Sequence, residues 1–278
     1  MSIRVRDQLM RALGELRHEP TAKRVRATLG DQTVIDSTRA VLVWEPRRVV
    51  PSYAVPAEDV RGELVPRQPT MPTAPVGVHL PDLSAVPILD PRVPFDVHST
   101  EGEPIGVRAP SGDRTAAGFR PTDPDLAGHV VLSFADFDAW YEEDQRIVSH
   151  PRDPFHRIDV LPSSRHVRLE LDGQLLAEST RAHLLFETML PTRYYLPRED
   201  VRTELRPSAT RTFCAYKGEA SYWSPEVGGR VVDDLVWGYQ APLHDAAEVR
   251  GLVAFFEEKV DLVLDGQGRD RPLTPWSS

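Results

Sequence analysis

Apolar and polar residues alternate in several short stretches of the chain, and a period of two predicts half-buried β-strands. Val25–Leu29 and Val167–Leu171 alternate in this way, and each runs into a turn, Gly30-Asp31 or Asp172-Gly173, followed by a second apolar stretch. This pattern is typical of a β-hairpin. Further strands are predicted at Val41–Glu45, Leu184–Glu187, Gly229–Val232 and Leu252–Phe256. The chain is therefore expected to be mainly β.

Two stretches have a helical period instead. Apolar side chains share one face in residues 3–18, which predicts an N-terminal helix within residues 1–22. A second, inter-repeat helix is expected over Phe134–Gln145, because Ser133 is a typical N-cap residue and aromatic residues such as Trp140 follow at helical spacing.

One long segment occurs twice in the chain. Val25–Arg61 aligns with Val167–Arg202 when one residue is skipped after Glu45, and almost half of the aligned positions are identical. The spacing between the copies is that of a whole domain rather than of a solenoid repeat. We therefore expect two tandem domains: a first repeat at 23–147, a linker at 148–165, a complete second repeat at 166–270, and a tail at 271–278.

The first repeat departs from the second in its middle. Residues 62–97 are rich in proline, and fifteen of the 26 prolines lie between Pro46 and Pro124. Frequent proline removes the N–H donors of a strand, so this segment is predicted to be a surface loop with polyproline-like stretches. Where the second repeat has Cys214 and Lys217, the first has His98 and Glu101. We infer a degenerate first repeat that kept its framework and lost its site.

Charge and composition exclude several classes of function. The chain has 33 Lys and Arg against 42 Asp and Glu, a net charge of −9. A negative field repels phosphate, which argues against nucleic-acid and anionic-membrane partners. Cys214 is the only cysteine and no Cys/His group has zinc spacing, so no disulfide, metal or cofactor is expected. Without a spanning segment or signal peptide, a cytoplasmic, reducing location is expected.

The densest polar and aromatic stretch is Phe213–Trp223, in which a thiol, a phenol and an ammonium surround Gly218. Such groups suit a pocket for a polar or anionic ligand, and glycine lets backbone N–H groups approach it. Cys214 and Lys217 are the candidate catalytic residues, since a cysteine near a lysine can act as a nucleophile. The alternative is that Cys214 is a small buried apolar residue. Lys217 is one of three lysines beside thirty arginines.

Further candidates lie in segments that could line the same site. The Glu199-Asp200 pair and the Ser-Thr-Arg-Ala stretch at 179–182 recur in the first repeat, which favours a structural role, with Arg181 as an exception that could hold a carboxylate or phosphate. Trp223 and Trp237 could form pocket walls or fill a β core. The expected ligand-binding residues are Arg181, Tyr194, Tyr195, Arg198, Tyr216, Lys217, Trp223 and Trp237.

Four motifs together resemble the domain of unknown function 427 family. They are R-Y-Y-x-P-R-E-D-V-R at Arg193–Arg202, C-x-Y-K-G-x-A-S-Y-W at Cys214–Trp223, V-V-D-D-x-x-W-x-Y at Val231–Tyr239 and G-x-V-A-F at Gly251–Phe255. The resemblance covers nearly all of the second repeat and indicates a two-copy member. It implies small mainly-β domains of the β-tent, Mss4-like type, and an intramolecular pseudo-dimer of the two copies. It implies no particular reaction.

Two functions of different classes fit these observations. The first is binding of a small polar or anionic molecule in the second repeat, where Lys217 and Arg198 would hold an anionic group and the aromatic residues would stack on a ring; catalysis is left open. The alternative is a non-catalytic interaction module whose segment 62–97 docks a protein partner. A thiol-based redox role for Cys214 is a third possibility.

Overall fold

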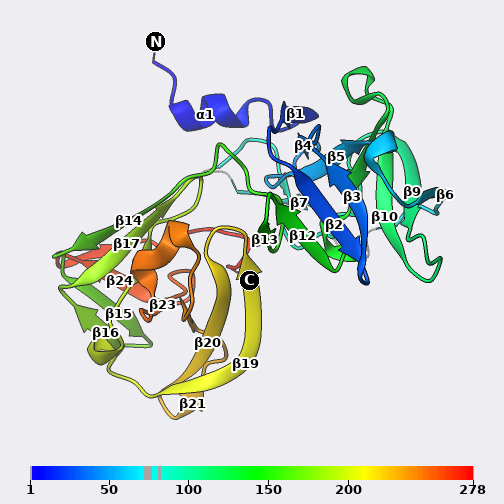
Figure 1. Ribbon diagram of the computed structural model, residues 1–278. Coiled ribbons are helices and arrows are strands. Elements are labelled where there is room, and N and C mark those ends of the chain that lie inside the picture. Colours follow the sequence, from blue (N-terminus) through cyan, green and yellow to red (C-terminus); the bar gives the residue numbers. More distant parts are fainter. Residues whose placement is uncertain (1, 72–76, 81–82, 278) are drawn as a thin grey trace. The chain divides into compact units, whose positions relative to one another are not determined.

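The computed structural model describes residues 2–71, 77–80 and 83–277, and it divides into two compact units, Met1–Asp153 and Pro154–Ser278 (Figure 1). Within the described residues, the ladders between named strands are antiparallel and every sheet belongs to one unit. The expectation of a mainly β protein is confirmed.

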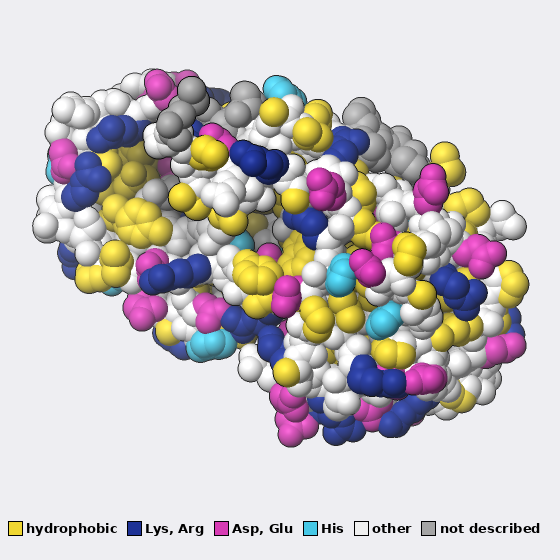
Figure 2. Space-filling model, turned by 90° about the horizontal axis from the view of Figure 1, so that it is seen from above, with side chains coloured by type: hydrophobic (Ala, Val, Ile, Leu, Met, Phe, Trp, Pro, Cys, Tyr) yellow, Lys and Arg dark blue, Asp and Glu magenta, His cyan; other side chains and the backbone are white. Residues whose placement is uncertain are grey.

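Lys, Arg, Asp and Glu side chains are interspersed on the face drawn in Figure 2. Across the described residues, no helix has the length and apolar character needed to cross a membrane.

The described residues of the first unit form a short helix, α1 (Val5–Met10), and three sheets. The seven-stranded sheet has the order β1 (Arg17–Pro20), β4 (Val41–Trp44), β5 (Ser52–Pro56), β11 (His129–Leu132), β10 (Thr115–Pro121), β9 (Gly102–Arg108) and β6 (Glu63–Pro66). The four-stranded sheet has the order β13 (Gln145–Ile147), β12 (Ala139–Glu142), β2 (Val25–Leu29) and β3 (Gln32–Ser37). The small third sheet pairs β7 (Gly77–Val78) with β8 (Ile88–Leu89). The 3-10 helices of this unit are η1 (Ala57–Asp59), η2 (Pro124–Leu126) and η3 (Phe134–Asp136).

The second unit also contains three sheets. Two of them have the orders β14 (Ile158–Ser163), β17 (Ala182–Glu187), β18 (Arg193–Tyr195), and β16 (Gln174–Ser179), β15 (Val167–Leu171), β24 (Asp261–Leu264), β25 (Gln267–Arg269). The third has the order β19 (Leu205–Cys214), β20 (Gly218–Val227), β22 (Val236–Tyr239), β23 (Ala254–Phe255), with β21 (Arg230–Val231) beside β20. The 3-10 helices are η4 (Arg198–Asp200) and η5 (His244–Val249). β14 lies inside the segment 148–165, which the sequence predicts to be a linker.

The sequence repeat folds in the same way in both units. The order β3-β2-β12-β13 corresponds to β16-β15-β24-β25, and both predicted hairpins form with a register shift near the middle of the first strand. The serine of each Ser-Thr-Arg-Ala stretch donates to the aspartate of the following 3-10 helix: Ser37 to Asp59 and Ser179 to Asp200, both at 2.6 Å. The repeated serine and aspartate therefore make the same hydrogen bond in both units.

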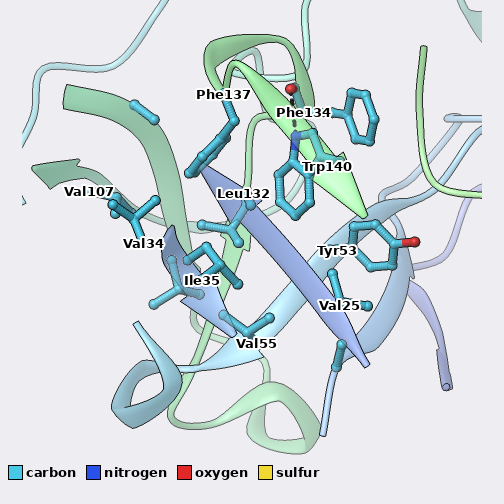
Figure 3. Close-up of a cluster of buried hydrophobic side chains, with 14 of the residues drawn as sticks. Val25, Val34, Ile35, Tyr53, Val55, Val107, Leu132, Phe134, Phe137 and Trp140 are labelled. Carbon is cyan, nitrogen blue, oxygen red and sulfur yellow. Dashed lines mark hydrogen bonds between the residues drawn. The ribbon is translucent and has the colours of Figure 1, made fainter. Parts of the chain in front are cut away.

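The core of the first unit corrects the expected helix over Phe134–Gln145. Figure 3 shows Phe134, Phe137 and Trp140 packed together against residues of β2, β3 and β5. The chain makes only the 3-10 helix η3 there and continues as strand β12, which pairs with β2 and β13. Trp140 donates from its indole nitrogen to the Phe134 carbonyl at 2.9 Å. The aromatic spacing that suggests a helix thus comes from a tight turn followed by a half-buried strand.

The N-terminal helix is shorter than expected. It ends at Met10, none of its residues is buried, and Arg17–Pro20 forms the edge strand β1. Leu13 follows the helix and is 1% exposed, packed with Leu80 and Ile88. The apolar spacing in residues 3–18 therefore reflects one buried leucine in a turn rather than a continuous helical face.

The proline-rich segment 62–97 is anchored, which corrects the expectation of a surface loop in its described part. β6 pairs with β9 at the edge of the large sheet, where proline is tolerated. The buried Arg48 side chain donates to the carbonyls of Val93 at 3.3 Å and Pro94 at 2.7 Å. These two carbonyl groups have no partner in a neighbouring strand, and the hydrogen bonds from Arg48 take the place of one. Residues 72–76 and 81–82 of this segment lie outside the described residues.

Candidate functional site

Successive residues of a strand point to opposite faces, and this divides the expected ligand-binding residues of the second unit into two sets. Trp237 of β22 lies opposite Tyr222 of β20, and its indole nitrogen donates to the Tyr195 hydroxyl at 3.2 Å. We call this side the Trp237 face. Trp223 and Tyr194 belong to a different core cluster, which we call the Trp223 face.

Lys217 lies on the turn between β19 and β20 and is 8% exposed. Its Nζ donates to Oε2 of Glu187, the last residue of β17, at 2.5 Å, and it also interacts with the Cys214 thiol. Oε1 of Glu187 is 3.0 Å from Nε2 of His156, whose ring stacks on Tyr216 with centroids 4.4 Å apart. We call these five residues the Lys217 cluster.

The turn that carries Lys217 depends on the glycine that follows it. Gly218 has a φ of +90°, a conformation that favours glycine, and the Lys217 carbonyl accepts a hydrogen bond from Leu243 at 3.1 Å. The glycine of the Cys-x-Tyr-Lys-Gly motif therefore reverses the chain, which places the ammonium of Lys217 beside the end of β17.

The electrostatics of the Lys217 cluster keep its central pair charged. Burial alone would lower the pKa of the Lys217 ammonium, but Cys214 and Glu187 outweigh this effect and raise it. Burial alone would raise the pKa of Glu187, but Lys217 and His156 hold it at about 2. At neutral pH the cluster thus presents an ammonium beside a half-buried thiol that forms no disulfide.

Hydroxyl groups continue from Cys214 along the same face of β19. The Thr212 hydroxyl lies 2.8 Å from the hydroxyl of Tyr222, and the Thr210 hydroxyl donates to Oδ2 of Asp234 at 2.6 Å. Thr212 is exposed, whereas Tyr239 is buried, and this burial raises the pKa of its phenol well above the ordinary value. A row of hydrogen-bonding groups beside a thiol and an ammonium can hold a polar molecule and place it against a nucleophile.

The remaining expected residues do not join the Lys217 cluster. The Arg198 guanidinium stacks on Trp223, 4.2 Å from the ring centroid. Arg181 pairs with Asp200 at 2.8 Å, as the equivalent Arg39 pairs with its own aspartate in the first unit. Tyr194 lies on the Trp223 face. Arg198 and Lys217 therefore do not form one anion-binding pair within the second unit.

The first unit keeps the buried acid of the cluster but not its other members. Glu45, which aligns with Glu187, is 1% exposed. Its Oε1 is 2.7 Å from Nδ1 of His98, and its Oε2 accepts from the Ser99 amide at 2.6 Å. The His98 ring stacks on Phe119. A histidine thus aligns with Cys214 and forms a hydrogen bond with the acid, where the second unit has a lysine.

Sequence patterns alone do not reveal Glu187 and His156 as members of the site. The available signal for Glu187 is its recurrence as Glu45 at the end of the aligned segment, where a strand of apolar residues ends in an acid in both copies. His156 lies in the segment expected to be a linker and carries no such signal. Among the described residues, no group of three or more His, Cys, Asp and Glu is arranged to hold a metal ion.

Comparison with known proteins places the chain in a family. The family model described as Domain of unknown function (DUF427) matches residues 17–76 and 159–266, which is more than half of the chain and includes part of each repeat. No curated protein matches the chain. The two matched segments contain Glu45 in the first unit and the whole of β17, β19 and β20 in the second. The chain therefore belongs to the DUF427 family, as a member with two copies of the domain.

Proposed function

We propose that the second unit binds a small polar molecule at the Lys217 cluster and that Cys214 is the reactive group of this site. The observation that supports the proposal most directly is the buried ammonium of Lys217, held between a half-buried thiol and the Glu187 carboxylate. The first unit has no equivalent arrangement among its described residues and is proposed to serve as a framework without a site.

The energetic cost of the cluster supports a functional role. Burial of an ion pair costs several kcal/mol of desolvation per ion, and the attraction between the partners often does no more than offset it. The first unit folds around the same buried acid with His98, a backbone amide and the charge of the nearby Arg48, and without a lysine. Because the fold does not require a lysine at this place, the charged pair in the second unit needs another explanation.

The charges of the cluster favour one ligand class. Lys217 is already balanced by Glu187, so a strongly anionic molecule gains little from it. The ammonium of Lys217 has three N–H donors, and its hydrogen bond to Glu187 uses one of them. We propose a polar ligand with a carbonyl or carboxylate oxygen that accepts from Lys217, and with further polar groups that bind along Thr212 and Tyr222.

Cys214 gives this site chemical reactivity as well as affinity. Cysteine sulfur is a nucleophile that can form a covalent bond with a bound molecule. A ligand carbonyl held by Lys217 would lie beside this sulfur, so the arrangement suits nucleophilic addition of Cys214 to the carbonyl carbon. In this addition the S–C bond forms as the C=O π bond breaks, and the proton of the thiol ends on the carbonyl oxygen. We also propose a cytoplasmic location, because a reducing compartment keeps the thiol available.

Docking of a protein partner through 62–97 has less support. In the described part of the segment, carbonyl groups that a partner would need are bound by Arg47 and Arg48. A deletion of this segment that abolished a specific partner, with ligand binding unchanged, would favour the interaction module instead.

The test is a thermal-shift screen of the full chain against nucleotides and carbonyl-bearing or carboxylate-bearing metabolites. Each hit is repeated on Lys217→Met, on Thr212→Val, which changes an exposed side chain, and on Lys259→Met as the matched control. We expect the stabilisation by a true ligand to be lost in Lys217→Met, to be reduced in Thr212→Val and to be unchanged in the control. Hits that survive all three substitutions equally would contradict the assigned site, and Thr212→Val keeps this test valid if Lys217→Met does not fold.

A further inference from the structure

A separate pocket of about 190 Å³ opens beside Tyr194 on the Trp223 face of the second unit. Val260 and Leu262 form part of its apolar wall, Glu257 reaches it from the interior, and Arg269 with Asp270 adds charged groups. Tyr194 and Tyr195 are neighbours on β18 and point to opposite faces, so this pocket is distinct from the Lys217 cluster.

The Tyr194 hydroxyl has no hydrogen-bond partner among the described residues, although the residue is only 8% exposed. The equivalent tyrosine of the first unit, Tyr53, donates to Oε1 of Glu142 at 2.6 Å, and Glu142 also pairs with Lys23. A buried phenol normally has a hydrogen-bond partner. The Tyr194 hydroxyl instead opens to solvent in the pocket, so its hydrogen-bonding capacity is available to an occupant.

Glu257 adds a buried acceptor to the same pocket. It is 3% exposed, and its Oε2 pairs with Nη1 of Arg193. Arg193 is also held by Glu258, at 2.8 Å and 2.5 Å, so two carboxylates share one guanidinium. The Glu257 carboxylate also accepts from the Tyr194 amide, at 3.4 Å, and from its own backbone amide. The triad is one positive charge short, and one of its two carboxylates lines the pocket.

We propose that this pocket is a second binding site of the chain and that it takes a small primary ammonium compound with a short alkyl body. The ammonium would donate to Glu257 and to the Tyr194 hydroxyl, and the alkyl carbons would pack on Val260 and Leu262. Arg269 and Asp270 both line the pocket and offset each other, which leaves Glu257 as the uncompensated charge. A carboxylate ligand would meet repulsion from Glu257 instead.

Burial raises the pKa of Glu257 to about 7, and the neighbouring Glu258 carboxylate adds to this effect while Arg193 opposes it. The remaining charged groups at the pocket are Arg269 and Asp270. A bound ammonium would take the place of the proton that Glu257 otherwise carries near neutral pH. Binding of an amine should therefore strengthen as the pH rises from about 6 to about 8, while the amine itself stays protonated.

The test is an NMR titration of the full chain with n-propylammonium, n-propanol and propionate at matched ionic strength and a pH of about 8. We expect n-propylammonium to shift the Tyr194 ring signals with saturation, and n-propanol and propionate to cause no saturable shift. Tyr194→Phe should weaken n-propylammonium binding about three- to tenfold, the usual effect of one lost hydrogen bond. Glu257→Gln should weaken it at least about tenfold.

Tyr141→Phe, on β12 of the first unit, is the matched control and should leave n-propylammonium binding unchanged. Equal shifts from all three probes, or an unchanged affinity in Tyr194→Phe, would overturn the proposal. Because the three probes are compared on the wild-type chain, the result does not depend on whether Glu257→Gln folds. Failure of this site would leave the Lys217 cluster untouched, since none of the readouts involves Cys214.

Discussion

Two aligned acids show how much of the chemistry is decided by single residues. Glu45 and Glu187 both end a stretch of apolar strand residues, and their side chains are 1% and 6% exposed. The first acid is satisfied by His98 and an amide, whereas the second is satisfied by Lys217 and His156. The same backbone position therefore supports an acid bonded to a histidine in one unit and an ion pair beside a thiol in the other.

Glu187→Gln should destabilise the second unit in a pH-dependent way. The folded-state pKa of Glu187 is about 2, below its ordinary value of 4.5. An acid with a lowered pKa contributes stability above its unfolded pKa and loses it as the pH falls through the folded one. This difference corresponds to about 3 kcal/mol at neutral pH. We expect urea unfolding to show a loss of about that size near neutral pH, which shrinks as the pH approaches the folded-state pKa.

Glu199→Gln is the control for this experiment, because Glu199 is an exposed acid on η4 whose partner Arg181 is 3.8 Å away. Its substitution should change the stability by less than about 0.5 kcal/mol at each pH. A constant difference between wild type and Glu187→Gln from neutral pH down to a pH of about 3 would show that the ion pair with Lys217 does not stabilise the fold.

At the scale of the elements, local patterns are predictable and long-range ones are not. The hairpins β2–β3 and β15–β16 follow from alternation and a turn, both of which lie within a short stretch of chain. The helix expected over Phe134–Gln145 is wrong because aromatic spacing cannot distinguish a helix from a 3-10 turn that leads into a strand. Within the candidate site, Cys214 and Lys217 stand out in the sequence because they share one turn. Glu187 does not, because it meets Lys217 from 30 residues away.

Strand β22 positions the aromatic side chains of the Trp237 face through a glycine. Gly238 lies between Trp237 and Tyr239, and a Cβ atom there would overlap the carbonyl oxygen of Leu252. Because the obstacle is backbone, Gly238→Ala should force β22 and its neighbouring segment apart at a cost of about 2 kcal/mol. The measurement is urea unfolding followed by tryptophan fluorescence, to which Trp237 contributes as one of the five tryptophans of the chain.

Gly268→Ala is the matched control for Gly238→Ala. Gly268 lies in β25, and a Cβ atom added there would meet no other atom within 4 Å, so the substitution should be neutral or slightly stabilising. Equal effects of the two substitutions would mean that the close approach of Leu252 to β22 is not what requires glycine at position 238.

For the whole molecule, the repeat gives two units that share the strand order of their four-stranded sheets and differ in their chemistry. The units comprise Met1–Asp153 and Pro154–Ser278, and among the described residues each sheet and each hydrophobic cluster lies within one of them. A domain with its own core and its own hydrogen-bonding network can fold alone. The intramolecular pseudo-dimer stays a prediction. The sheets, each of which lies within one unit, support the expectation that each unit folds independently.

The fragment 154–278 should therefore fold without the first unit. Its core clusters contain Trp223 and Trp237, so a folded fragment will show a near-ultraviolet circular dichroism signal and one cooperative urea transition. The fragment 166–278 is the informative comparison, because it lacks β14, the edge partner of β17, together with His156. We expect it to be less stable by several kcal/mol, since Glu187 loses a partner and β17 loses a ladder. Equal stability of the two fragments would mean that the segment before 166 is a linker after all, and that His156 does not support the charged pair of Glu187 and Lys217.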